Sequence, residues 1–368
     1  MNKIEHLIQQ LCPEGVEYKS LGKVCDIRRG SSITKSAVTE GSIPVIAGGR
    51  TPAYFHNISN RIGETIVIAG SGAYAGFVSW WEQPIFVSDA FSIKSHDDLL
   101  TKFCFYWLKN MQQRLYDLKS GGGVPHVYPR DIEVLFIPIP PLEIQKEIVN
   151  ILDTFTQLEA ELEAELEARK KQYEYYRNSL LNFDDKEVEW KTLGEVGELK
   201  AGKSINVNSI SSAITEEYKY PVVGGNGLRG YAKSYSHEGS FPIIGRQGAL
   251  CGNINYTTGK FYATEHAVVA KTKANIDTRY LYHLLKVINL NKYATGGAQP
   301  GLAVSKIDKI KIPIPPLSEQ ERIVAILDKF DALVNDISVG LPAEIEARKK
   351  QYEYYREKLL TFKEKPNA

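Results

Sequence analysis

Cysteine and methionine are scarce in this sequence, and long apolar runs are missing. The 368 residues include four cysteines and two methionines. The cysteines lack the paired spacing of a structural zinc site or a disulfide framework, so we expect free thiols in a reducing cytoplasm. No apolar run approaches the roughly 20 residues that span a bilayer, and the first residues lack a signal-peptide stretch, so we expect no membrane partner. The cysteines are Cys12, Cys25, Cys104 and Cys251.

Catalytic motifs are missing as well. A methyltransferase acting on an amine needs Asn or Asp directly before Pro-Pro and an aromatic residue. Here Pro-Pro occurs only at 140–141 and 315–316, each time after isoleucine and before leucine. Glu265, His266 and His283 do not have the spacing of metal ligands. We therefore expect no catalytic residues and no metal site.

One segment does fit a nucleotide-binding pattern. Gly197–Ser204 matches GxxxxGK[ST], in which the backbone and the lysine hold phosphates where a strand leads into a helix. The residues that follow, Ile205–Ser212, are poor helix formers, and the matching segment Cys25–Ser32 lacks the lysine. We interpret the segment as a turn between strands. A nucleotide-binding enzyme that uses Lys203 remains the less favoured alternative.

The sequence repeats itself. Arg169–Arg177 and Arg348–Arg356 are identical at all nine positions, and the six residues of Ile137–Leu142 return as Ile312–Leu317. Gln145 and Gln320 follow at matching places. Such repetition indicates a tandem in which one chain stands in for a symmetric dimer.

Each repeat ends in a helical segment. Apolar residues recur at steps of three and four, the pattern of long helices that pack side by side. We expect two long antiparallel helices, each of about 40 residues and forming a coiled coil. Gly340 and Pro342 should break or kink the second one. The residues chosen for helix packing or partner docking are Ile148, Phe155, Leu162, Tyr173, Tyr176, Ile323, Phe330, Ile337, Tyr352 and Tyr355.

The remainder of each repeat is rich in glycine and less alike. Thr65–Ala69 and Phe241–Ile244 are typical of buried strands, and Phe103–Leu108 and Tyr280–Leu285 of short helices. We predict an α+β fold, with two α/β domains separated by the two long helices and an internal pseudo-two-fold repeat. The expected segments are an N-terminal piece closing the repeat (1–17), a first globular domain (18–141), a central spacer helix (142–184), a second globular domain (185–316) and a C-terminal spacer helix (317–368).

Charge is segregated along the chain although its net value is +1. Residues 18–141 hold 13 basic against 10 acidic residues, a net charge of +3, and residues 190–316 hold 16 against 8, a net charge of +8. Residues 142–189 hold 6 against 13, a net charge of −7. Two basic globular parts favour a polyanionic partner that is bound at two places.

Glycine-rich loops carry the candidate contacts to such a partner. Ala69–Gly76 and Gly245–Gly252 occupy equivalent positions, and glycine lets a backbone approach a ligand closely. Arginine and glutamine are side chains that read the edges of guanine and adenine. The candidates are Arg50, Ser71, Tyr74, His126, Lys203, Arg229, Arg246, Gln247 and Gln299.

This layout resembles the DNA-specificity subunit of type I restriction-modification systems. The resemblance covers essentially the whole chain and lies in the two variable domains, the Pro-Ile-Pro-Pro-Leu segments with their glutamines, and the near-identical helices. It implies a non-catalytic protein whose two target recognition domains each read half of a split, asymmetric sequence in double-stranded DNA. It also implies that the helices act as spacer and dock two methyltransferase subunits, which restriction subunits then join.

The resemblance further implies that this chain holds no cofactor of its own. S-adenosylmethionine, ATP and magnesium would belong to the partner subunits. A coiled-coil scaffold that binds only protein is the other alternative.

Overall fold

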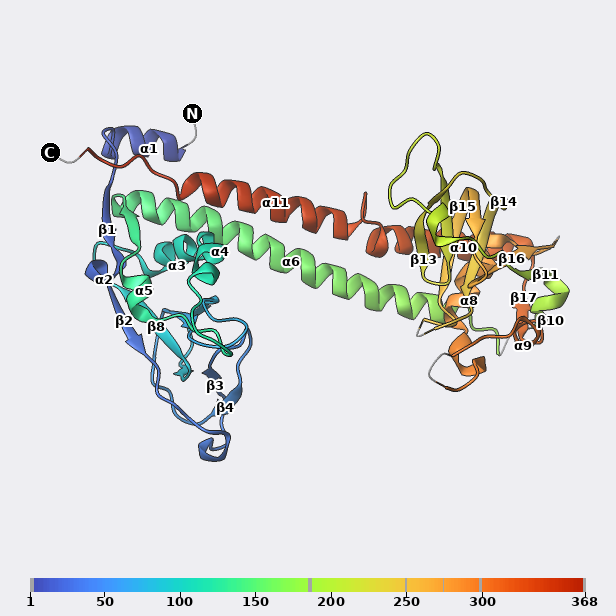
Figure 1. Cartoon of the computed structure of the whole chain (residues 1–368), viewed down its shortest axis with the longest axis horizontal. Coiled ribbons are helices and arrows are strands. Elements are labelled where there is room, and N and C mark those ends of the chain that lie inside the picture. The colour runs from blue at the N-terminus through green and yellow to red at the C-terminus, as the bar shows by residue number, and fades with distance from the viewer. Residues whose placement is uncertain (1–2, 185–186, 249, 274, 298–299, 367–368) are drawn as a thin grey trace. The chain divides into compact units, whose positions relative to one another are not determined.

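The computed structural model describes residues 3–184, 187–248, 250–273, 275–297 and 300–366. The chain forms two compact units, unit 1 from Met1–Glu163 with Ile345–Ala368 and unit 2 from Ala164–Glu344 (Figure 1). Each unit therefore holds one globular part and stretches of long helix. In the described ranges, no helix is both long and apolar enough to cross a membrane.

Unit 1 is built on short strands with helices packed against them. Its strands are β1 (Glu17–Ser20), β2 (Cys25–Arg29), β3 (Ile43–Ile46), β4 (Tyr54–His56), β5 (Thr65–Ala69), β6 (Val78–Trp81), β7 (Phe86–Val87), β8 (Ala90–Ser95) and β9 (Phe136–Ile139). Its short helices are α1 (Lys3–Leu11), α2 (Leu21–Val24), η1 (Lys35–Ala37), α3 (Thr101–Asn110), α4 (Gln112–Asp117) and α5 (Pro129–Glu133). The sheets have the orders β2-β8-β5-β6, β4-β3-β7 and β1-β9.

The core of unit 1 lies between the four-stranded sheet and α3. All five residues of β5 are buried, which confirms the strand predicted over Thr65–Ala69. The predicted helix over Phe103–Leu108 is α3, and its Phe103 and Leu108 are fully buried. Burial of several such side chains, each contributing about 1.5–3 kcal/mol, holds the helix on the sheet.

Unit 2 repeats this plan with a larger sheet. Its strands are β10 (Glu189–Thr192), β11 (Gly197–Ala201), β12 (Tyr220–Gly224), β13 (Gly227–Ala232), β14 (His237–Gly245), β15 (Ile254–Ala263), β16 (Ala267–Thr272) and β17 (Lys311–Ile314). Its short helices are α7 (Leu193–Val196), η2 (Val207–Ser209), α8 (Thr278–Val287), η3 (Leu290–Tyr293) and α9 (Val304–Ile307). The sheets have the orders β11-β16-β14-β15-β12-β13 and β10-β17. The predicted strand Phe241–Ile244 is part of β14, and the predicted helix Tyr280–Leu285 is α8.

The proline-rich segments lie in two-stranded pairs. Pro138 of β9 lies opposite Tyr18 of β1, and Pro313 of β17 lies opposite Trp190 of β10. A proline has no amide hydrogen to donate, so it fits a strand with one free edge and not a central strand. Each segment leads directly into a long helix, α6 (Leu142–Leu180) in one case and α10 (Leu317–Asn335) in the other.

The second long helix is interrupted, as Gly340 and Pro342 predict. α6 is continuous over 39 residues, whereas α10 and α11 (Leu341–Leu359) have 19 residues each. A Cβ at Gly340 would lie 2.7 Å from the carbonyl oxygen of Asp336, so a larger residue does not fit there. The choice of Ile337 as a packing residue is wrong, because this residue lies in the break and is 84% exposed.

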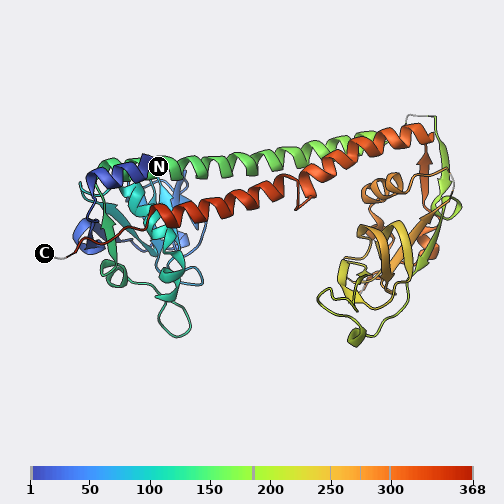
Figure 2. The same ribbon diagram turned by 90° about the horizontal axis from the view of Figure 1, so that it is seen from above.

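Each unit packs its long helices around one phenylalanine between two tyrosines. In unit 1 the ring of Phe155 on α6 lies 6.1 Å from Tyr352 and 5.7 Å from Tyr355 on α11, between ring centroids. Lys349 lies one turn before these tyrosines and pairs with Glu159 and Glu163, later on α6, so the two helices run antiparallel (Figure 2). In unit 2 the ring of Phe330 on α10 packs at 6.1 Å and 5.5 Å against Tyr173 and Tyr176 of α6.

The other packing residues follow the same stripe. Ile148 and Ile323 are fully buried, and Leu162 is half-buried. The ring contacts of Phe155 and Phe330 with their neighbouring tyrosines confirm the predicted helix-packing role of these residues.

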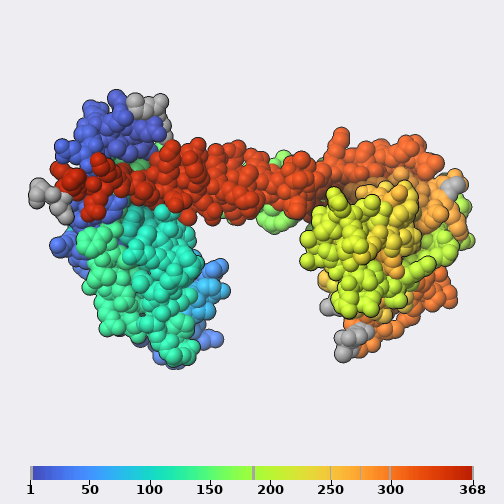
Figure 3. Space-filling view, turned by 45° about the horizontal axis from the view of Figure 1, so that its top comes forward, coloured from blue at the N-terminus to red at the C-terminus, as the bar shows by residue number. Residues whose placement is uncertain are grey.

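Within unit 1, the described N-terminal segment packs against the long helices and contacts the segment that follows α11. Ile4 of α1 is buried, and Lys3 pairs with Glu147 at 2.6 Å. The hydroxyl of Tyr18 donates a hydrogen bond of 3.0 Å to the carbonyl of Phe362. The space-filling view shows these first residues against the end of α11 (Figure 3). The N-terminal segment thus covers the end of the long-helix pair in this unit.

A buried glutamine fastens each globular part to the helix that leaves it. The side chain of Gln145 has no exposed surface and binds the main chain of Leu100, Asp98 and Pro140 at 2.8, 2.9 and 2.8 Å. Gln320, also fully buried, binds the main chain of Asp277, Asn275 and Pro315 at 2.8, 3.1 and 2.8 Å. The matching glutamines noted in the sequence are therefore structural anchors.

Candidate nucleic-acid interface

Three loops converge at one end of the sheet in unit 1. They follow β3 (residues 47–53), join β5 to β6 (70–77) and precede α5 (118–128). The amide of Gly72 donates to the carbonyl of Pro125 at 2.9 Å, and the amide of Val127 donates to the carbonyl of Gly70 at 3.0 Å. These bonds hold the second and third loops together, while Gly48 in the first loop lies against the carbonyl of Ser71.

Unit 2 holds its loops by the same bonds. The amide of Gly248 donates to Pro300 at 3.0 Å, and the amide of Leu302 donates to Arg246 at 2.8 Å. Gly225 takes the place of Gly48, and its Cβ would lie 3.0 Å from the Cα of Gly245. The predicted equivalence of the glycine-rich loops is therefore present in the backbone itself.

Glycine is required at two positions of each second loop. Gly72 and Gly76 have φ values of +81° and +86°, and Gly248 and Gly252 have +81° and +88°. These values lie in the left-handed region, which other residues rarely adopt. A Cβ at Gly76 would also lie 2.7 Å from the carbonyl oxygen of Leu115. The sequence folds in this way locally because only glycine fits.

The predicted contact residues of unit 1 come together on these loops. The guanidinium of Arg50 stacks on the ring of Tyr74 at 4.6 Å, and Tyr74 is 42% exposed. Ser71 forms a bridge with His126, so both lie where the second and third loops meet. The hydroxyl of Ser71 donates a hydrogen bond to the carboxylate of Asp89.

The predicted contact residues of unit 2 are less tightly grouped. Arg229 and Gln247 are exposed and line a cavity of about 410 Å³ together with His266. Arg246 is half-buried at the start of the second loop and is not among the lining residues. Gln299 lies outside the residues that the structure describes.

The same region of unit 2 has several buried polar atoms without a partner. In the described residues these include Nε of Arg246, Oγ1 of Thr264, Oε2 of Glu265 and Nδ1 of His266. Buried polar atoms are nearly always hydrogen-bonded, so a cluster of four that are not is unusual. Of these four residues, His266 also lines the cavity of about 410 Å³.

Lys203 lies outside the three loops, and its segment is not a phosphate-binding loop. Residues 197–201 form strand β11, which pairs with β16, and the next element is only the three-residue 3-10 helix η2 (Val207–Ser209), which does not begin at the lysine. The interpretation of the segment as a turn is wrong for residues 197–201, which form a sheet strand equivalent to β2, whereas residues 202–204 lie in the loop that follows it. The amide of Lys203 donates to the carbonyl of Ala263 at 3.0 Å. The nucleotide-binding alternative lacks the strand-to-helix geometry that it needs.

Two residues at the loops escaped prediction. Asp89 and His266 directly precede β8 and β16, and their carbonyls accept from the amides of Gly70 and Arg246 at 3.1 and 3.0 Å. The repeat alignment that pairs Gly72 with Gly248 also pairs Asp89 with His266, provided that one extra residue is allowed in the second repeat. That signal was available, but neither residue belongs to a glycine-rich segment.

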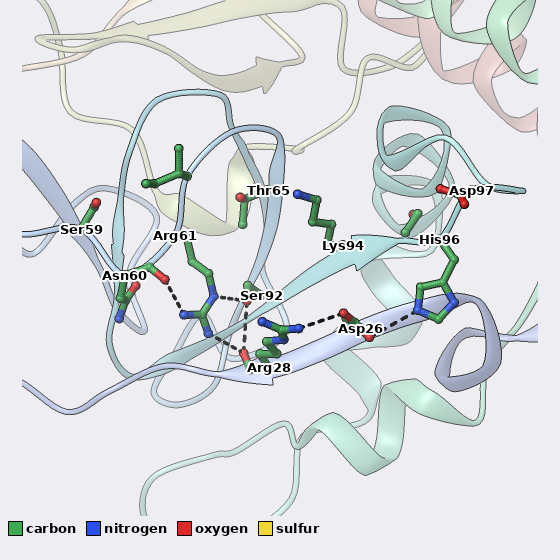
Figure 4. A pocket seen from close by; sticks show the side chains of 12 residues that line it. Asp26, Arg28, Ser59, Asn60, Arg61, Thr65, Ser92, Lys94, His96 and Asp97 are labelled. Carbon is green, nitrogen blue, oxygen red and sulfur yellow. Dashed lines mark hydrogen bonds and ion pairs between the residues drawn. The ribbon is translucent and has the colours of Figure 1, made fainter.

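A second feature lies at the other end of the sheet in unit 1. A cavity of about 800 Å³ is lined by residues of β2, β8 and the loop before β5 (Figure 4). Asp26 accepts from Arg28 at 3.0 Å and contacts His96 at 3.3 Å, and the hydrogen bond from His96 lowers the pKa of Asp26. The guanidinium of Arg61 is held by the hydroxyl of Ser92 at 2.6 Å.

Unit 2 has a similar pairing of an acidic with a basic residue across the equivalent strands. Asp26 lies opposite Lys94 on paired strands, and Glu198 lies opposite Lys271. A cavity of about 470 Å³ is lined there by residues that include Glu198, Lys200 and Lys271. The described residues contain no group of three or more histidine, cysteine, aspartate or glutamate side chains that could hold a metal ion.

The chain is similar to proteins of one family over most of its length. The type I restriction modification DNA specificity domain matches it twice, over residues 13–168 and 185–347. The type I restriction enzyme EcoprrI specificity subunit of Escherichia coli is 37% identical over 92% of this chain and 93% of its own. The EcoR124I/EcoR124II specificity subunit of Escherichia coli is 36% identical over 73% of each chain.

Solved structures share the fold. The S subunit of a type I restriction-modification system from M. genitalium has a TM-score of 0.70 at 20% identity, covering 96% of this chain and 97% of that chain. A chain from a study of complex assembly and conformational transition of the type I R-M system has a TM-score of 0.60 at 18% identity, covering 94% and 97%. These matches confirm the resemblance and the α+β fold inferred from the sequence. The chain belongs to the family of type I restriction modification DNA specificity domains, of which it carries two copies.

Proposed function

We propose that this chain is the DNA-specificity subunit of a type I restriction-modification complex. Each three-loop surface reads one half of a split, asymmetric target in double-stranded DNA. The observation that carries this proposal is that the loops of the two units share their backbone bonds but differ in their exposed side chains. A common frame with different side chains is what two readers of different half-sites require.

Charge supports a DNA partner. The globular segments have net charges of +3 and +8, while residues 142–189 between them have −7. Lysine and arginine on the globular parts release counterions from the DNA backbone and supply affinity that does not depend on sequence. A few loop side chains then supply the choice of bases. The chain itself performs no catalysis in this proposal and acts in the cytoplasm.

The repeated helices fit two copies of one partner. The identical nine-residue segments bury Tyr173 and partly bury Tyr352 against the helix pair but leave Tyr175 and Tyr354 exposed by 68% and 61%. Exposed tyrosines are frequent anchors of protein interfaces. We assign these surfaces to two methyltransferase subunits, which restriction subunits join. S-adenosylmethionine, ATP and magnesium are bound by those subunits and not by this chain.

A binding measurement tests the proposal. The chain is purified with its methyltransferase, and methylome sequencing of a host that expresses both supplies the target. We expect the complex to bind that target at least about 1,000-fold more tightly than random duplex at the same salt concentration. Equal affinity for both duplexes would contradict the proposal. A matched variant, Tyr175→Ala with Tyr354→Ala, should weaken methyltransferase binding without changing the target sequence.

A further inference from the structure

Asp89 and His266 occupy the same position in the two units. Each follows a short strand or turn and precedes an equivalent strand, β8 or β16. Around this position the backbone bonds match: Gly30 donates to Ala90 at 2.9 Å, and Gly202 donates to Ala267 at 2.9 Å. The two units therefore carry different side chains, a carboxylate and an imidazole, at equivalent positions of the same loop backbone.

In unit 1 this place carries an acceptor. Asp89 is exposed, and among the described residues no lysine, arginine or histidine forms an ion pair with it. Within the part of the chain that the structure describes, its side chain accepts a hydrogen bond from the hydroxyl of Ser71, which donates to Oδ2. A Cβ at Gly48 would lie 3.3 Å from that hydroxyl oxygen, so the glycine leaves it room. Ser71 thus orients the carboxylate and leaves its other oxygen free to accept a hydrogen bond.

An unpaired carboxylate on a DNA-binding surface lowers affinity for any sequence, because it repels the phosphates. It favours binding only where it accepts a hydrogen bond from a base. In the major groove cytosine offers its N4 amine, and adenine offers its N6 amine beside the N7 acceptor. A carboxylate facing N7 would be repelled, whereas cytosine has no such acceptor in the groove. Cytosine is therefore the base that suits Asp89.

In unit 2 the same place has a different chemistry. His266 lines the cavity of about 410 Å³ with Gln247, and its Nε2 lies 3.2 Å from Glu265. Its Nδ1 and the hydroxyl of Thr264, a residue with no exposed surface, lack partners in the described chain. No free carboxylate equivalent to Asp89 is present at this position. The cytosine preference should accordingly be confined to unit 1.

We propose that Asp89, oriented by Ser71, is a specificity-determining residue of unit 1 that accepts a hydrogen bond from the N4 amine of a cytosine in its half-site. This inference rests on the proposed function, because it takes the three-loop surface as the reader of DNA. It goes further by naming the base, the atom and the residue.

The test compares methylome motifs. The chain is expressed with its methyltransferase as wild type, as Asp89→Ala and as the control Asp97→Ala, which removes an exposed carboxylate at the far end of β8. We expect one half-site of the wild-type motif to contain an invariant cytosine that becomes degenerate in Asp89→Ala. The other half-site and the spacing between the halves should stay the same. Asp97→Ala should reproduce the wild-type motif.

A binding measurement with a modified base completes the test. A duplex carrying a pyrimidin-2-one nucleotide, which lacks the N4 amine, replaces cytosine at that position. We expect wild-type complex to lose about tenfold in affinity and the Asp89→Ala complex to lose none. His266→Ala should change only the other half-site.

Several outcomes would overturn the inference. They are an unchanged motif in Asp89→Ala, a change in both half-sites, an adenine at the altered position, or equal effects of the modified base on both complexes. If Asp89→Ala abolishes methylation, Asp89→Asn is used, because it keeps the size and an acceptor oxygen; it should retain the cytosine and raise affinity for random duplex. Failure of the proposed function looks different, since the wild type itself would then give no motif.

Discussion

The two units use one backbone frame for two different sets of side chains. Gly72 and Gly248 donate to equivalent prolines, yet the residue directly before each glycine is Ser71 in one unit and Gln247 in the other. The backbone is constrained because left-handed glycines and close backbone contacts leave no alternatives. Exposed side chains at the rim of the loops meet no such constraint. Specificity can therefore change in this frame without any change in how the loops fold.

The join between each globular part and its helix shows the same division. The anchors Gln145 and Gln320 make the same three bonds, but the neighbouring contact differs. Tyr106 donates a hydrogen bond to Asp153 in unit 1, whereas His283 binds Asp328 at 2.6 Å in unit 2. The anchor is fixed because a buried amide must satisfy all of its hydrogen bonds. The neighbouring pair needs only one donor and one acceptor, which two residue types can supply.

We expect the largest effect from a change in the length of α6, the long helix that is continuous. Inserting Leu-Glu-Ala-Glu after Leu158 adds about one turn, or about 6 Å, to α6. We expect the spacing between half-sites to increase by one or two base pairs and affinity for the original target to fall by about 1,000-fold. Methylome sequencing measures the new spacing. An unchanged spacing would show that α6 does not set it.

Strain in the loop frame comes next. Gly76→Val and Gly252→Val should each destabilise one unit by about 2–4 kcal/mol, since both positions have positive φ and close neighbours. Hydrogen exchange should show lost protection in the loops of the altered unit alone. Gly122→Ala is the control, because its Cβ meets nothing within 4 Å, and it should have little effect. Loss of protection in both units would argue against independent frames.

The anchors should respond alike. Gln145→Ala and Gln320→Ala each leave main-chain groups without their partner, and each should lower the free energy of unfolding by about 2–3 kcal/mol. Denaturant titration of the full chain, with hydrogen exchange to assign the unit, measures both. A cost in one unit and none in the other would break the equivalence that the repeat indicates.

The pair beside each anchor predicts a difference in acid stability. Burial lowers the pKa of His283 although Asp328 accepts a hydrogen bond from it, while burial raises the pKa of Tyr106 in unit 1. An unfolded histidine has a pKa of about 6.5, so the contribution of neutral His283 to the stability of unit 2 is fully present above that pH. This contribution is lost as the pH falls from about 6.5 to the lower pKa of the folded state, since in that range only the unfolded state binds the proton.

Hydrogen exchange between pH 7 and 5 measures this difference. Unit 2 should lose protection before unit 1, and His283→Tyr, which introduces the residue of unit 1, should reduce the pH dependence. His237, whose pKa burial also lowers, accounts for the part that remains. An identical pH dependence of wild type and His283→Tyr would contradict the assignment.

The smallest effect is expected at the helix break. Ile337→Ser should change the free energy of unfolding by less than about 0.5 kcal/mol, because the side chain is 84% exposed. Leu327→Ala, on the buried stripe of α10, should cost about 2–5 kcal/mol. Thermal unfolding of both variants checks the contrast. A large cost at Ile337 would mean that another surface covers it.

Much of this architecture could be predicted because it depends on local rules. The starts of α6 and α10 after Pro-Pro, the break at Gly340, and the strand over Thr65–Ala69 follow from backbone geometry and apolar runs. The failures have a different origin. Ile337 has the spacing of the apolar helix positions, but it lies in the break between α10 and α11. The residues from Gly197 match a phosphate-binding loop motif, but they form a strand that pairs with β16.

The sequence by itself determined the tandem, the order of the elements and the glycines on which the loops depend. Repeats, prolines and left-handed glycines act over a few residues, so their effect is visible in the chain. Only the tertiary structure brought Asp89 to Ser71 and placed His266 beside Gln247. Such juxtapositions join residues about 18 positions apart through strand pairing, and no local propensity encodes them.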